Sequence, residues 1–301
     1  MLKIRNLEVK FKTIEGVVKA NNKVSLELKK DEILGLIGET GCGKTVLGMT
    51  IMRLLPKNSE VKGEIIYKGK NLLELSEKEM REIRGKEIAI MLQNPSLSLN
   101  PVLSVGEQIA EVFLYHDKLS KKDAMRKASE MLKIVGITPK RINEYPHQFS
   151  GGMKQRIMIA IALALNPKIL IADEPTKGLD SSTKEQIINL MKKLTKGKSM
   201  LLITHDLDIA EKLCDRIAVM YAGEIVEILS NFNKAKHPYT IGLLNSLPRR
   251  GLKPIDGVSP SLISPPSGCK FHPRCKYREE ICTIKNPELK NGVRCFRNDK
   301  S

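Results

Sequence analysis

The sequence lacks the features of a membrane-spanning or base-stacking protein. It contains no tryptophan, aromatic residues make up only 4% of its 301 residues, and no apolar run approaches the ~18 residues that a spanning helix needs. The longest apolar run, IMIAIALAL (Ile157 to Leu165), suits a buried helix. The opening, MLKIRNLEVKF, has no apolar segment followed by a cleavage site. We therefore expect a cytoplasmic chain.

Acidic residues are in the minority. The 34 Asp and Glu residues face 51 Lys and Arg residues, and the formal net charge is +17. Such a charge raises nucleic acid, anionic lipid or a polyanionic ligand as partners. The basic residues are spread along the chain with no block of five or more, and aromatic residues for base stacking are few. This distribution favours an ordinary solvated surface, and we expect no nucleic-acid partner.

The hydrophobic pattern predicts an α/β fold with a mixed central sheet. Residues 2–11 and 24–28 alternate with period two, which is typical of an N-terminal antiparallel lobe. Residues 32–38 then predict a strand, and a helical pattern from Lys44 to Leu55 ends before Pro56. Three later apolar runs suit central parallel strands: 87–92, 169–172 and 200–204.

A helical insertion interrupts this alternation at about residues 94–165. Ser104 with Glu107 predicts a capping box, Ser120 a second helix start, and Gly136 a helix stop. After Leu229 the periodicity fades and proline becomes frequent. We predict a core domain over residues 1–230 and a small C-terminal appendage over 231–301.

The segment GETGCGKT (Gly38 to Thr45) has the pattern of a phosphate-binding loop. It follows a predicted strand and opens a predicted helix, which is the context that such a loop requires and which disfavours an ordinary glycine-rich turn. Backbone N–H groups would converge on the phosphates, Lys44 would reach the β- and γ-phosphates, and Thr45 would bind Mg²⁺. The predicted nucleotide contacts of this loop are Gly38, Glu39, Thr40, Gly41, Cys42, Gly43, Lys44, Thr45 and Val46.

An acidic pair follows the strand predicted at 169–172. Asp173 would hold Mg²⁺ and Glu174 would polarise the attacking water, because ligands bind at the carboxyl edge of such sheets. The alternative is a pair of acids that cap the next turn. The phosphate loop upstream favours the catalytic interpretation.

Several weaker signals accompany these motifs. Gln93 and His205 each follow a predicted strand, and Asp180 lies shortly after the acidic pair. The segment FSGGMKQR (Phe149 to Arg156) opens a long apolar helix and forms a second potential anion site, through Ser150, Gly151 and Gly152. Two phosphate sites beside one acidic pair are reasonable if the second serves a nucleotide held by a partner.

Taken in this order, these motifs resemble the ATP-binding cassette (ABC) family over about residues 1–230. The resemblance implies a P-loop NTPase fold of the ABC type that binds ATP and Mg²⁺. It implies that "FSGG" is the signature loop that closes over the partner's nucleotide. It also implies catalytic roles for Glu174, His205 and Gln93, and Mg²⁺ ligation by Thr45, Gln93 and Asp173. Phe11 would stack on adenine, or else pack inside its strand lobe.

Narrower stretches resemble the ATPase subunits of oligopeptide and dipeptide importers. They are QNPSLSLNPVLSVGEQIAE (Gln93 to Glu111), CDRIAVMYAGEIVE (Cys214 to Glu227) and HPYTIGLLNSLP (His237 to Pro248). TKGLD (Thr176 to Asp180) departs from the Thr-Ala-Leu-Asp form of that subfamily. The resemblance implies a peripheral subunit on the cytoplasmic face of the membrane. Its partners would be a different second ATPase, two permeases and an extracytoplasmic solute-binding protein. The alternatives are a nickel or other small-solute importer and a soluble cassette acting on ribosomes or DNA.

Four of the six cysteines lie near the C-terminus: Cys269, Cys275, Cys282 and Cys295. Disulfides are disfavoured in the cytoplasm, so this group favours a metal, and the spacing leaves zinc and iron–sulfur both open. The subfamily resemblance implies a [4Fe–4S] cluster. We expect its role to be structural, because nothing in the ATPase motifs calls for electrons. Cys42 and Cys214 are expected to be small buried residues.

Overall fold

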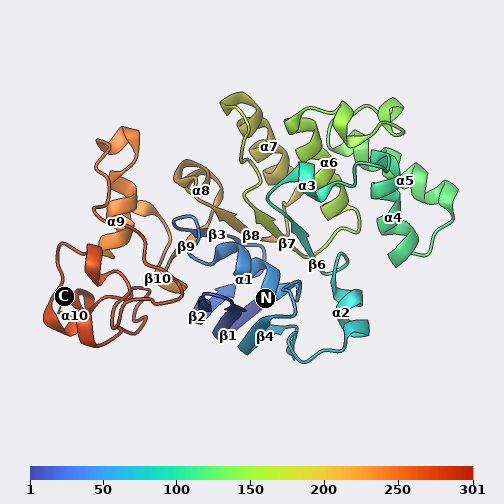
Figure 1. Cartoon of the computed structure of the whole chain (residues 1–301). Helices are drawn as coiled ribbons and strands as arrows, with labels where there is room; N and C mark the ends of the chain where they lie inside the picture. The colour runs from blue at the N-terminus through green and yellow to red at the C-terminus, as the bar shows by residue number, and fades with distance from the viewer. Residues whose placement is uncertain (301) are drawn as a thin grey trace. The chain divides into compact units, whose positions relative to one another are not determined.

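The computed structural model describes residues 1–300, which divide into two compact units. The first unit joins Met1–Glu74 to the chain from Ile203 onward, and the second comprises Leu75–Leu202. Each unit contains both strands and helices (Figure 1). The predicted division at residue 230 stays a prediction.

The N-terminal lobe is the antiparallel sheet that the alternation predicts. In β1 the side chains of Leu2, Ile4, Leu7 and Val9 are buried while most of their neighbours face solvent, so one face of the strand packs on the core. Strand order is β2-β1-β4-β5, and each neighbouring pair runs antiparallel. The strands are β1 (Leu2–Thr13), β2 (Gly16–Leu28), β4 (Ser59–Tyr67) and β5 (Lys70–Asn71).

The first unit also carries the strand that leads into the glycine-rich loop. This strand, β3 (Ile33–Ile37), runs parallel to β9 (Arg216–Tyr221), and β9 pairs antiparallel with β10 (Glu224–Leu229). The helices of this unit are α1 (Lys44–Ile51), α8 (Leu207–Leu213), α9 (Pro238–Asn245) and α10 (Glu280–Ile284).

The proline-rich C-terminal region shares a hydrophobic core with these strands. Tyr239 and Phe271 are buried in the same cluster as Ile37, Val219 and Tyr221. A bridge between Glu227 and Val293 also links β10 to the last part of the chain. Figure 1 accordingly shows the orange and red segments beside β10. The C-terminal region is thus stabilised by packing against β3, the strand that precedes the glycine-rich loop.

The second unit combines parallel strands with most of the helices. β6 pairs parallel with β7, and β8, which ends just inside the first unit, is the other neighbour of β7. Its strands are β6 (Ile88–Met91), β7 (Ile169–Asp173) and β8 (Ser199–Thr204). Its helices are α2 (Glu77–Ile83), α3 (Pro95–Ser98), α4 (Val105–His116), α5 (Lys121–Ile134), α6 (Gly151–Leu163) and α7 (Ser181–Leu194).

Helix boundaries follow the capping signals closely, with one exception. Ser104 and Glu107 form the predicted capping box of α4, and Ser120 caps α5. Helix α1, however, ends at Ile51 rather than at Leu55, because Arg53 adopts a left-handed φ of 51°. The backbone there closes as a Schellman turn, which glycine usually provides.

No helix within residues 1–300 has the length and apolar character needed to cross a membrane.

Candidate functional site

The loop between β3 and α1 requires glycine at two positions. Gly38 (φ 152°) and Gly43 (φ 107°) lie so close to other strands that a Cβ would stand 2.1 Å from the carbonyl oxygen of Met220 and 2.2 Å from that of Ala20. Both distances are too short for any side chain. Gly43 is also the N-cap of α1 and supplies no capping side chain. The N–H groups of the first turn are therefore suited to an anion.

Lys44 lies directly over this loop. Its side chain is buried, and its ammonium donates to the carbonyl oxygens of Gly38 at 2.7 Å and Glu39 at 2.9 Å. Thr45 is exposed at the start of α1. The arrangement fits a loop that holds phosphate, with a cation beside the phosphate and a hydroxyl free to face Mg²⁺.

The other predicted contacts around the loop differ in exposure. Cys42 is buried, and burial raises the pKa of its thiol despite the opposing charge of Lys44. It is thus a neutral packing residue, as expected. Glu39 and Val46 are half-buried, whereas Thr40 is exposed. Phe11 is half-buried on β1 opposite Val18 of β2, a position compatible with both of its predicted roles.

His205 belongs to the same unit as the loop. It follows β8 directly and is exposed. The next residue, Asp206, caps α8 through its side chain. His205 is therefore held between two regular elements.

The acidic pair lies in the second unit, at the carboxyl end of β7. Asp173 is the last residue of the strand, and Glu174 follows it; both are buried. Glu174 has a φ of 48°, in the left-handed region that a residue other than glycine seldom adopts. Such backbone strain is concentrated at functional sites, which agrees with a catalytic role for this carboxylate.

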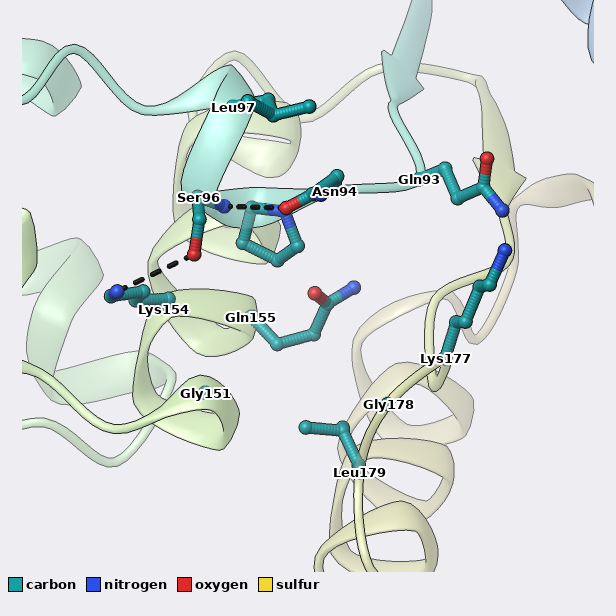
Figure 2. Close-up of a pocket in the computed structure, with 11 residues that line it drawn as sticks. Gln93, Asn94, Ser96, Leu97, Gly151, Lys154, Gln155, Lys177, Gly178 and Leu179 are labelled. Carbon is teal, nitrogen blue, oxygen red and sulfur yellow. Dashed lines mark hydrogen bonds between the residues drawn. The ribbon is translucent and has the colours of Figure 1, made fainter.

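A cavity of about 460 Å³ in the second unit brings together Gln93 and the signature segment. Its walls come from the chain after β6, the start of α6 and the segment before α7 (Figure 2). The amide of Gln93 and the ammonium of Lys177 point toward one another in this view. Lys154 and Lys177, which the motif analysis did not single out, make this cavity cationic.

The starts of α6 and α7 are held against each other beside this cavity. Ser150 caps α6, and a Cβ on Gly152 would lie 2.5 Å from Cγ2 of Thr183, so only glycine fits there. Asp180 caps α7, accepting from the Thr183 N–H at 3.0 Å and from its hydroxyl at 2.6 Å. These hydrogen bonds lower the pKa of Asp180. Asp180 thus has a structural task that the motif alone did not reveal.

The predicted site residues fall into two sets. The phosphate loop and His205 belong to the first unit, while Gln93, the acidic pair, the signature and Asp180 belong to the second. That the two sets meet around one nucleotide stays a prediction.

Residues from distant parts of the chain also contact the loop, and the sequence did not predict them. Asn21 donates to the carbonyl of Gly43 at 3.1 Å, and Tyr239 accepts from the N–H of Glu39 at 3.0 Å. Arg274 pairs with the Glu39 carboxylate at 2.9 Å. The sequence motif of the loop does not predict these three contacts.

The four C-terminal cysteines line one small pocket, together with His237 and Phe271. All are free thiols, and burial raises the pKa of Cys269 to about 11, with the other three adding to the shift. Across residues 1–298, no three His, Cys, Asp or Glu side chains are grouped closely enough to hold a metal ion. The structure therefore gathers the cysteines without forming a metal-binding geometry.

The fold and the phosphate loop together define a nucleotide-binding cassette, and the comparisons agree. Residues 21–177 match the family model described as "ABC transporter", and residues 224–282 match "Oligopeptide/dipeptide transporter, C-terminal region". The chain belongs to the ABC transporter family. It is an ATPase subunit of the oligopeptide/dipeptide importer type.

Among its relatives, the chain is 48% identical to the dipeptide transport ATP-binding protein DppD of Bacillus subtilis, covering 94% of this chain and 88% of that protein. It is 46% identical to the oligopeptide transport ATP-binding protein OppD of the same organism, covering 96% of this chain and 85% of that protein. The dimeric cassette MJ0796, solved in a post-hydrolysis state with ADP and Pi, is 32% identical with a TM-score of 0.68 over 76% of this chain and 98% of that one. The predicted ABC-type fold is confirmed.

Proposed function

We propose that this chain is the ATP-binding and hydrolysing subunit of a multi-subunit importer for oligopeptides or dipeptides. The observation that carries this cargo class is the match of residues 224–282 to the C-terminal region of such transporters. A cassette alone would fit many cargoes, but this region distinguishes the importer type. The names of the DppD and OppD relatives support the same cargo.

The nucleotide roles follow from the chemistry of the named groups. Lys44 and the N-terminus of α1 would bind the phosphates of ATP. The family resemblance implies Thr45, Gln93 and Asp173 as the residues that would hold Mg²⁺, and the ion would supply charge neutralisation there. Glu174 polarises the attacking water, with His205 assisting. Phe11 contacts the adenine.

A second cassette subunit completes each site. The phosphate loop and the signature segment are both helix N-termini suited to phosphate, yet they belong to different units of the chain. We infer that Ser150, Gly151 and Gly152 close over a nucleotide held by the partner, and that the subfamily resemblance favours a different chain as that partner. The dimeric arrangement of MJ0796 supports a paired assembly.

The surface formed by the residues that follow Gln93 is suited to contact the permease subunits. Leu97 and Val102 are 84% and 75% exposed there, and Leu97 lines the cavity of Figure 2. Exposed apolar side chains at the rim of a cavity are suited to a docking helix. The chain would then act as a peripheral subunit on the cytoplasmic face. A solute-binding protein would deliver the cargo to the complex.

Cargo class is tested by stimulation of ATP hydrolysis. The complex is reconstituted with its permeases in vesicles, and the ATPase rate is measured with the binding protein loaded with a di- or tripeptide, loaded with nickel, or empty. We expect stimulation by the peptide-loaded protein alone. Stimulation by nickel alone would reject the peptide cargo and favour the small-solute alternative.

We propose that the four cysteines of this pocket ligate an iron–sulfur cluster, with zinc as the alternative, because the subfamily resemblance implies such a cluster. A [4Fe–4S] cluster is larger than a zinc ion and takes four cysteines, which this pocket supplies. The pocket holds about 20 Å³, so the side chains must part to admit the cluster. It would then stabilise the C-terminal region.

Anaerobically purified protein should be brown and carry about four irons per chain. We expect Cys275→Ser to lose colour and iron and to lower the melting temperature. Cys214→Ser, which removes a thiol outside the pocket, is the matched control and should keep both. Colourless wild-type protein that contains stoichiometric zinc would contradict the proposal without affecting the ATPase role.

A further inference from the structure

Glu39 places a carboxylate inside the phosphate-binding loop, and this carboxylate carries the same sign of charge as the ligand. It lies between two residues that matter for phosphate binding: Gly38, whose backbone is left-handed, and Lys44, which donates to the carbonyl of Glu39. A carboxylate left free at this position would repel the phosphates of a nucleotide. The structure shows how that charge is held.

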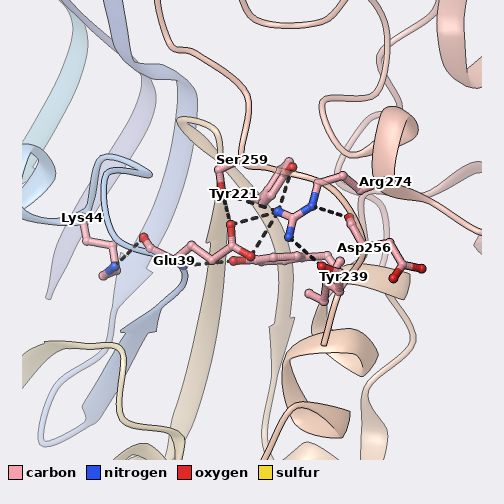
Figure 3. A network of polar contacts seen from close by, with 8 residues as sticks. Glu39, Lys44, Tyr221, Tyr239, Asp256, Ser259 and Arg274 are labelled. Carbon is pink, nitrogen blue, oxygen red and sulfur yellow. Dashed lines mark hydrogen bonds and ion pairs between the residues drawn. The ribbon is translucent and has the colours of Figure 1, made fainter. Parts of the chain in front are cut away.

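Arg274, from the short helical turn His272–Arg274, neutralises Glu39. Its Nη1 lies 3.1 Å and 2.9 Å from the two carboxylate oxygens, and only 7% of the Arg274 side chain is exposed. The hydroxyl of Ser259 donates to the same carboxylate. In Figure 3 the Glu39 side chain extends toward Arg274, on the side away from Lys44. The Arg274 side chain is thus buried, Glu39 is half-buried, and the Glu39 carboxylate is directed away from the lysine.

The guanidinium is itself fixed by the C-terminal region and by the end of β9. Its Nε donates to the carbonyl of Asp256 at 3.0 Å, and its Nη1 lies 3.4 Å from the hydroxyl of Tyr221. An arginine with this many fixed partners has little freedom to leave Glu39.

The backbone of Glu39 has a second anchor in the same region. The Tyr239 hydroxyl accepts the Glu39 N–H at 3.0 Å, and the Tyr239 ring is fully buried against Tyr221, with ring centroids 4.5 Å apart. Burial, and then the charge of Glu39, raise the pKa of Tyr239, so its hydroxyl stays neutral. Carboxylate, N–H and carbonyl of this one loop residue are therefore all engaged.

We propose that Arg274 and Tyr239 are positioning residues of the nucleotide site, through which the C-terminal region holds the phosphate loop in its binding conformation. Arg274 neutralises and turns away the Glu39 carboxylate, and Tyr239 fixes the Glu39 backbone. This inference rests on the proposed nucleotide site at the phosphate loop. It gives the C-terminal region a direct part in ATP binding.

Nucleotide affinity of the full chain tests the proposal. The dissociation constant for Mg-ATP is measured with Arg274→Gln, Glu39→Gln, the double variant and Tyr239→Phe. Arg274→Gln should weaken binding by about tenfold, since a charge-assisted hydrogen bond is lost and a carboxylate is left unpaired. In the Glu39→Gln background the same change should cost less than about twofold. Tyr239→Phe should weaken binding by about threefold.

Rescue by Glu39→Gln separates this role from general destabilisation, which would weaken binding equally in both backgrounds. Lys276→Gln is the matched control: it removes a cation close to Arg274 that pairs with the exposed Asp256, and binding should not change. Lys44→Ala should abolish binding; if it does not, the proposed nucleotide site itself is wrong. If Lys44→Ala abolishes binding but Arg274→Gln and Tyr239→Phe leave it unchanged, the positioning role is wrong. If Arg274→Gln fails to fold, the dissociation constant of Tyr239→Phe for Mg-ATP tests the positioning role by itself.

Discussion

Replacing Glu174 with glutamine will lower the ATPase rate of the assembled transporter by about 10²- to 10⁴-fold, because an amide cannot take the proton of the attacking water. ATP binding will persist, since the function proposed here assigns the phosphates to Lys44 and the start of α1, which this substitution leaves unchanged. The buried position of Glu174 at the end of β7 and its left-handed backbone agree with a fixed catalytic carboxylate.

Steady-state hydrolysis and nucleotide binding should be measured on the same preparation. Glu185→Gln, an exposed acid on α7, is the matched control and should retain the wild-type rate. Turnover by the Glu174→Gln complex close to that of the wild type would remove Glu174 from the catalytic role.

The isolated chain will hydrolyse ATP slowly, and its partner subunits will raise the rate by about 10²-fold. The reason is that, in the proposed shared site, the signature loop supplies phosphate-directed N–H groups to the nucleotide of a second cassette, and one such set of donors is typically worth this factor. Ser150→Ala in this chain should then impair hydrolysis at the partner's phosphate loop, because Ser150 fixes the start of α6.

The measurement is the specific ATPase rate as a function of protein concentration, with and without partners. Wild-type chain alone should show a low rate that rises with concentration. A dilute monomer that hydrolyses ATP rapidly at a constant specific rate would be incompatible with a shared site.

Local signals predicted much of the second unit and of the phosphate loop. The capping box at Ser104, the stop at Gly136 and the strand–loop–helix around Lys44 all depend on residues adjacent in sequence, where backbone geometry and hydrogen bonding are decided locally. The sequence did not predict the early end of α1, because the left-handed residue there is Arg53, which has no preference for that conformation, and not glycine.

The C-terminal region was the least predictable part. Its periodicity fades among prolines, yet Pro238 opens α9 at a position where proline is favoured, and Tyr239 and Phe271 enter a core with β3 and β9. Its contacts with Glu39 join residues that lie 200 and 235 positions apart. Such contacts arise from tertiary packing and leave no local pattern in the sequence.

The most direct test of the importer function is ATP-driven peptide accumulation. The chain, its second cassette subunit and the permeases are placed in vesicles with ATP on the cassette side and a binding protein carrying a labelled peptide on the other. The function proposed for this chain predicts accumulation of the peptide on the ATP side with the wild-type chain and none with Glu174→Gln. Equal peptide accumulation with both chains, or none with either while ATP is hydrolysed, would contradict it.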